Sequence, residues 1–66
     1  MYIYKVIFDN NKVIASTRIK SPYFKSVAIE DVHGKKFVKW IIVYASDEQE
    51  SIEAATTVVK NYFHFL

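Results

Sequence analysis

Residues 2–19 alternate in side-chain character on both sides of Asn10-Asn11, and this alternation constrains the fold more than any other feature of the chain. Because successive side chains of a strand point to opposite faces, the even positions from Tyr2 to Phe8 share one apolar face. Asparagine tolerates the positive φ that a two-residue type I′ turn requires, so the pattern predicts a β-hairpin. The predicted pairs are Phe8–Val13, Val6–Ala15, Tyr4–Thr17 and Tyr2–Ile19.

A second hairpin is predicted around the one glycine of the chain, Gly34. Ser21-Pro22 separates it from the first hairpin, because proline cannot donate to a β-ladder and restricts the residue before it. Gly34 supplies the permissive backbone of the turn, and His33 belongs to the residue types that tolerate positive φ. The predicted pairs are Asp31–Lys36, Ile29–Val38 and Val27–Trp40.

The last third of the chain has the periodicity of an amphipathic helix over about residues 47–65. Ser46 is the predicted N-cap, with Gln49 reaching back to the Ser46 amide. Acidic residues gather in the first turns and Lys60 lies near the end, as the helix dipole favours. The apolar stripe that is expected to face the sheet consists of Ile52, Ala55, Val59, Tyr62, Phe63 and Leu66.

These elements predict one α+β domain over residues 1–66, since a 66-residue chain has no room for a second core. The fold class is a four-stranded antiparallel sheet of two hairpins with one C-terminal helix packed on one face (ββββα). We expect a meander, because sequential strands are usually neighbours. The alternative order, 2-1-4-3, would place the two most apolar strands at the centre and leave polar edges. The expected strands cover about 2–8, 12–20, 23–31 and 36–45.

Composition excludes several kinds of chemistry. Without cysteine the chain has no disulfide, thiol nucleophile or cysteine zinc site, and one glycine is too few for a dinucleotide loop or a P-loop. The two histidines, His33 and His64, have no partner at ligand spacing, and no serine lies in a nucleophile elbow. We therefore expect no catalytic residue, no cofactor and no metal site, and an enzyme is the third and least favoured hypothesis.

No membrane segment is expected either. The longest apolar run, residues 40–45, is far shorter than the ~20 residues that span a bilayer. The first residues also lack the basic region and long apolar stretch of a signal peptide. We expect a cytoplasmic protein.

The sheet face away from the helix is predicted to carry more apolar surface than a monomer leaves in water. The leading hypothesis is therefore a small non-catalytic protein–protein interaction module. We expect a homodimer associating through the open sheet face or the edge strands, with another protein as a further possible partner. The candidate interface residues are Ile3, Ile7, Ile14, Phe37, Ile41 and Val43, extended by Val58 and Phe65 of the helix.

The alternative hypothesis is a single-stranded nucleic-acid-binding module. Residues 1–45 carry eight Lys or Arg against three acids, or +5, whereas residues 46–66 carry one Lys against four acids, or −3. Basic and aromatic side chains on a sheet bind single strands by pairing with phosphates and stacking on bases. The candidate residues are Lys5, Arg18, Phe37 and Lys39. Glu30, beside them on that face, and the single predicted aromatic weaken this hypothesis.

Overall fold

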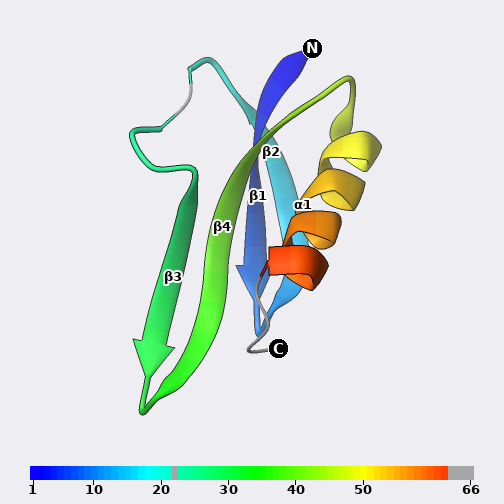
Figure 1. Ribbon diagram of the computed structural model, residues 1–66. Helices are drawn as coiled ribbons and strands as arrows, with labels where there is room; N and C mark the ends of the chain where they lie inside the picture. The colour runs from blue at the N-terminus through cyan, green and yellow to red at the C-terminus, as the bar shows by residue number, and fades with distance from the viewer. Residues whose placement is uncertain (22, 63–66) are drawn as a thin grey trace.

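The computed structural model describes residues 1–21 and 23–62, and it has two layers, a sheet and one helix (Figure 1). The strands are β1 (Tyr2–Asp9), β2 (Lys12–Ile19), β3 (Val27–Val32) and β4 (Lys35–Ala45), and α1 covers Glu48–Tyr62. All strand pairs are antiparallel. The predicted ββββα fold class is confirmed.

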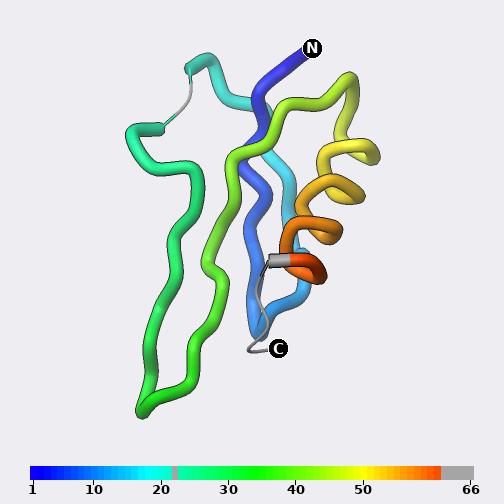
Figure 2. The backbone as a smooth tube through the Cα atoms, in the orientation of Figure 1, coloured from blue at the N-terminus to red at the C-terminus, as the bar shows by residue number. Residues whose placement is uncertain are grey.

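The strand order is β2-β1-β4-β3, so the predicted meander is wrong. Figure 2 shows the two central strands, β1 and β4, running side by side between the outer strands. Every strand residue that is fully buried belongs to β1 or β4, for example Val6 and Val38. The central positions give the most apolar strands a neighbour on both sides, and this burial outweighs the preference for sequential neighbours.

Both tight turns form as predicted. Asn10 and Asn11 have φ values of 53° and 63°, and His33 and Gly34 have φ values of 52° and 82°. All four residues are thus in the left-handed region that a type I′ turn requires. Next to each turn the predicted pairing also holds.

Further from each turn, both ladders shift by one residue. The β1–β2 shift lies between Ile7 and Phe8, where Ile14 is the extra residue of β2. The predicted pairs beyond Phe8–Val13 are therefore wrong, and Tyr4 lies opposite Arg18. Because side chains alternate along a strand, one extra residue moves all that follow to the other face.

The β3–β4 ladder shifts between Ala28 and Ile29, where Lys39 is the extra residue of β4. Val27 consequently lies opposite Ile41, and the predicted Val27–Trp40 pair is wrong. β3 also begins four residues later than predicted, because residues 24–26 are bent.

The core lies between α1 and the sheet, where α1 contacts β4, β1 and β2. Ala45 and Ala55 are fully buried and leave room for a close approach of the helix. Ser51, also fully buried, donates its hydroxyl to the Glu48 carbonyl and accepts from Ser16 at 2.7 Å, so no polar group there lacks a partner. The buried apolar residues are Tyr4, Val6, Phe8, Val38, Ile41, Val43, Ala45, Ala55 and Val59.

The start of α1 differs by one residue from the prediction. Asp47, not Ser46, is the cap, since its carboxylate accepts the Glu50 amide at 2.8 Å. Glu50, not Gln49, reaches back and accepts the Ser46 amide at 3.1 Å. The acid is the stronger cap because it also carries charge toward the positive end of the helix dipole. The predicted stripe residues Phe63 and Leu66 lie outside the described residues.

Candidate binding face

The sheet face that α1 leaves uncovered, called the open face here, is defined by the alternation along each strand. Tyr4, Val6 and Phe8 are buried toward α1, so the residues between them lie on the open face. Their cross-strand partners lie on the same face, which assembles a continuous surface across four strands. Its side chains are Ile3, Lys5, Ile7 and Asp9 of β1, Lys35, Phe37, Trp40, Ile42 and Tyr44 of β4, Lys12, Ala15, Thr17 and Ile19 of β2, and Ala28, Glu30 and Val32 of β3.

The structure places the predicted interface residues in three different environments. Ile3, Ile7 and Phe37 are half-buried on the open face, as expected. The expected placement of Ile41 and Val43 on this face is wrong, because both are core residues with 3% and 8% of their surface exposed. The extra residue Lys39 reverses the alternation of β4 beyond it, so Trp40, Ile42 and Tyr44 lie on the open face instead.

The remaining interface candidates do not join that face. Ile14, the extra residue of β2, is 63% exposed at the outer strand. Val58 is half-buried against the core on the helix side. Phe65 lies outside the described residues.

The predicted nucleic-acid residues are also divided by the shifted ladders. Lys5 lies on the open face between Thr17 and Ile42. Lys39 is exposed, with its Nζ 3.9 Å from the Glu30 carboxylate. Arg18 lies on the helix side, where its guanidinium stacks 3.6 Å from the centroid of the Tyr2 ring.

Sequence reasoning missed the aromatic side chains that gather around Lys5. Tyr23, from the connection between β2 and β3, packs its ring edge against Trp40, with centroids 5.1 Å apart and planes at 77°. The Lys5 Nζ lies 4.9 Å from the Tyr23 centroid and 5.4 Å from the Trp40 centroid, within cation–π range of both rings. We call Lys5, Tyr23 and Trp40 the aromatic–lysine cluster. Nothing local in the sequence marks it, because it depends on the extra residue Lys39 in β4 and on the packing of Tyr23 against the sheet.

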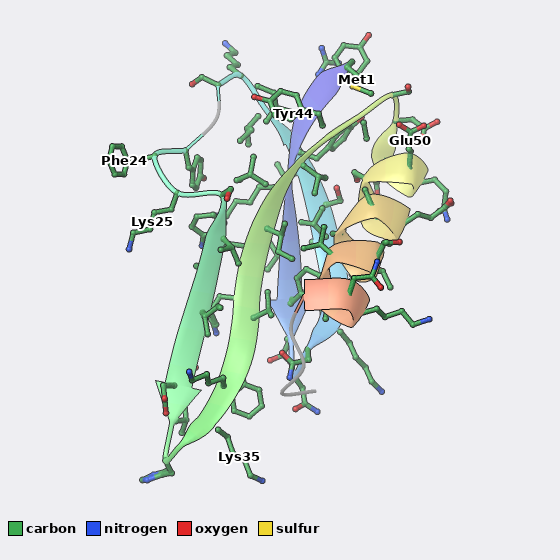
Figure 3. The ribbon with its side chains drawn as sticks, in the orientation of Figure 1. Met1, Phe24, Lys25, Lys35, Tyr44 and Glu50 are labelled. Carbon is green, nitrogen blue, oxygen red and sulfur yellow. The ribbon has the colours of Figure 1, made fainter. Side chains whose placement is uncertain are left out.

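Charge separates the two layers of the molecule. The open face and the adjoining residues 20, 21 and 23–26 carry Lys5, Lys12, Lys20, Lys25 and Lys35, with exposed Lys39 beside them, against the acids Asp9 and Glu30. The acids of α1 lie on the other layer, with Glu50 labelled there in Figure 3. The same view shows Phe24, which is fully exposed, and Lys25, which is exposed, projecting from the connection.

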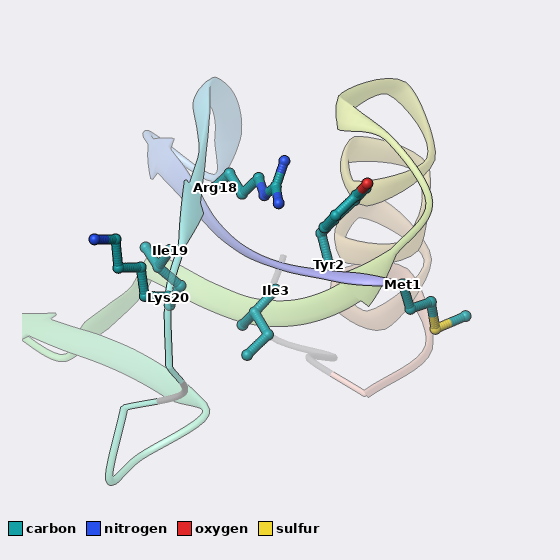
Figure 4. A pocket seen from close by; sticks show the side chains of 6 residues that line it. All are labelled: Met1, Tyr2, Ile3, Arg18, Ile19 and Lys20. Atoms are coloured by element: carbon teal, nitrogen blue, oxygen red, sulfur yellow. The ribbon is translucent and has the colours of Figure 1, made fainter.

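A hollow of about 530 Å³ lies where β1 begins and β2 ends. In Figure 4, Tyr2 and Arg18 lie on one side of β1 and Ile3 lies on the other. These side chains therefore do not point into one common space. Within residues 1–21 and 23–62, no three His, Asp or Glu residues gather as metal ligands. The residues that line the hollow include no His, Asp or Glu.

No helix among the described residues has both the length and the apolar character needed to cross a membrane. No family model, curated protein or solved structure matches the chain.

Proposed function

We propose that the protein is a non-catalytic binding module whose open face binds single-stranded nucleic acid. The observation that carries this proposal is the aromatic–lysine cluster, in which Lys5 lies against Tyr23 and Trp40. Bases stack on aromatic rings while cations pair with the phosphates between them. A cytoplasmic location, suggested by the absence of cysteine, is part of the same proposal.

Two tyrosine side chains at this face are exposed to solvent. Tyr23 is 44% exposed and Tyr44, further along β4, is 55% exposed. Trp40 is half-buried, held by Tyr23 on one side and by the strand neighbours Ile7 and Ala28. Several aromatic rings now occupy a face for which the sequence predicted one, Phe37, and this removes the main objection to nucleic-acid binding.

The geometry favours a single strand over a duplex. Exposed rings on a sheet can stack only on bases whose faces are free, and duplex bases are stacked on each other. A duplex reader would place a helix or a two-stranded ribbon in a groove. Here α1 begins with Glu48 and Glu50, and phosphates would repel these acids.

Fluorescence anisotropy tests this proposal directly. Labelled single-stranded DNA, single-stranded RNA and duplex DNA are titrated at low and near-physiological salt. We expect saturable binding to a single strand that weakens as salt rises, because phosphate contacts release counterions. Trp40 is the one tryptophan of the chain, so its fluorescence should be quenched when a base stacks nearby.

A matched pair of variants separates the open face from net charge. Lys5→Gln and Lys60→Gln remove one positive charge each, from the open face and from α1. Lys5→Gln should weaken binding several-fold, whereas Lys60→Gln should have almost no effect. Equal effects of the two variants, or no binding even at low salt, would contradict the proposal.

The second candidate is protein association through the open face, including the homodimer expected from the sequence. Ile3, Ile7 and Ile42 favour it, since they are half-buried aliphatic side chains that another surface would bury further. Lys5 counts against such a pair, because it lies between Ile3 and Ile7 and its charge would have to leave water when the face is covered. Ile42→Glu distinguishes the candidates, since it should abolish a dimer of this kind. A mass in sedimentation that is unaffected by Ile42→Glu would remove this candidate.

A further inference from the structure

β3 forms the edge of the sheet that α1 does not reach. Within residues 1–21 and 23–62, the helix contacts the other three strands but not β3. Ile29, opposite Val38 on the helix side of the sheet, therefore remains 44% exposed. An edge strand also presents unpaired backbone groups, which can pair with another chain.

The backbone directions along β3 can be derived from one hydrogen bond. The Ile42 amide donates to the Ser26 carbonyl at 2.8 Å, so the backbone groups of Ser26 point toward β4. These directions alternate along a regular antiparallel strand. The backbone groups of Val27 and Ile29 consequently point away from the sheet, available to a further strand.

The other edge strand, β2, is protected against such pairing. Its ladder is irregular at Ile14, and Lys12 and Arg18 lie near its two ends. Irregular geometry and cations are devices that discourage edge-to-edge association. β3 is regular along its own length and contains no Lys or Arg. Of the two edge strands, β3 is therefore the one more open to pairing with another strand.

We propose that two copies of this chain pair through β3, antiparallel and around a two-fold axis perpendicular to the sheet. In such a pair, helix-side residues must oppose helix-side residues. The register centred on Ala28 places Val27 opposite Ile29 of the second copy, and symmetry repeats that apolar pair. It covers the exposed Ile29 side chain on both copies.

Other registers of the same symmetry are less favourable. Centring the axis on Glu30 would place two carboxylates directly opposite each other. Centring it on Ile29 would place Val27 opposite Asp31. The Ala28 register instead sets Glu30 opposite the polar Ser26 of the second copy.

Charge complementarity supports the same register. Lys25 lies in the bent segment two residues before β3, and the Ala28 register brings this segment of one copy to the end of β3 that carries Asp31 of the second copy. The Asp31 carboxylate is held in place, since it accepts the Gly34 amide at 3.0 Å. The segment from Lys25 to Asp31 is thus complementary to itself in both apolar pairing and charge. A second copy of this chain is the partner that fits it.

This pairing has a consequence for the open face. A two-fold axis perpendicular to the sheet keeps both open faces on the same side of the joined sheets. Both aromatic–lysine clusters would then be available to one nucleic-acid strand, which raises its affinity through effective concentration. This consequence rests on the proposed function, whereas the pairing of β3 does not.

Sedimentation over a range of micromolar concentrations tests the pairing, with two exposed edge isoleucines as a matched pair. Ile29→Lys introduces a charge into the proposed apolar pairs, and Ile14→Lys makes the same change on the other edge strand. We expect the wild-type chain to approach the mass of two chains. Ile29→Lys should raise the dimer Kd by about tenfold or more, since both symmetric pairs are lost, and Ile14→Lys should leave it unchanged.

A wild-type monomer throughout this range, or an equal effect of the two variants, would overturn the proposal. Amide exchange of the wild-type chain is a test that needs no variant. The outward amide of Ile29 should exchange more slowly as the protein concentration rises, and an unchanged rate would overturn the pairing. Anisotropy with Ile29→Lys separates the two proposals, because a monomer that still binds a single strand retains the proposed function.

Discussion

The side chain of Asn11 connects the first turn to β4, and its replacement should have a well-defined cost. The last β1–β4 pair is Ile7 with Trp40, so β4 continues past the point where β1 leaves it. At Val38, which is 1% exposed, the amide donates to Oδ1 of Asn11 at 2.9 Å. A side chain thus supplies the acceptor that a continuing strand would have supplied.

Three substitutions separate the acceptor from the backbone conformation. Asn11→Asp keeps an acceptor and should change the free energy of unfolding little. Asn11→Gly leaves the buried Val38 amide unpaired, at about 1–3 kcal/mol, partly offset because glycine adopts positive φ freely. Asn11→Ala loses the acceptor and also incurs about 1–2 kcal/mol for an L-residue at a φ of 63°, for a total of about 2–4 kcal/mol.

Urea unfolding followed by Trp40 fluorescence measures these differences. A domain of 66 residues has a free energy of unfolding of roughly 3–10 kcal/mol, so the loss in Asn11→Ala should be large against the total. Asn10→Gly is the control, since Asn10 has a φ of 53° and no side-chain hydrogen bond among the described residues. Equal stability of Asn11→Asp and Asn11→Gly would refute the reasoning.

Three further predictions follow from single contacts. Gly34→Ala should lower the free energy of unfolding by about 1–2 kcal/mol for conformational reasons alone, because φ is +82° and no atom lies within 4 Å of the added Cβ; a much larger loss by urea unfolding would indicate a clash. Asp47→Ala should cost about 1 kcal/mol by removing the acceptor for the Glu50 amide, whereas Asp47→Ser should retain most of the stability in the same assay. Tyr23→Ala should weaken single-strand binding by about 1–3 kcal/mol in anisotropy, and unchanged affinity would exclude this ring from the binding surface.

The predictions that came true depend on residues close together in the chain. The Asn10-Asn11 and His33-Gly34 turns were predicted because their residue types accept positive φ, a property of the dipeptide itself. The pairs beside each turn follow from turn geometry for the same reason. The helix was predicted to within one residue at its start, where Ser46 was the predicted cap and the neighbouring Asp47 is the cap in the structure.

The candidate site could be predicted only in part. Ile3, Lys5 and Ile7 were placed correctly, since β1 is regular from its start to Ile7 and its alternation is local. Trp40 and Tyr44 were missed, because the extra residue at Lys39 reverses the alternation expected for β4. An extra residue cannot be recognised from the sequence when apolar residues occupy both faces of the strand. This is the case here from residue 40 to 45.

The sequence by itself determined the element types, the two turns and the ββββα class, because hydrogen bonds and φ preferences within a few residues select them. Tertiary structure decided the order β2-β1-β4-β3, the residues of the open face and the position of Tyr23 on Trp40. Each of these depends on which distant segments bury the most apolar surface together. The free energy of burying this surface depends on pairs of segments, so it cannot be read from any single stretch of the chain.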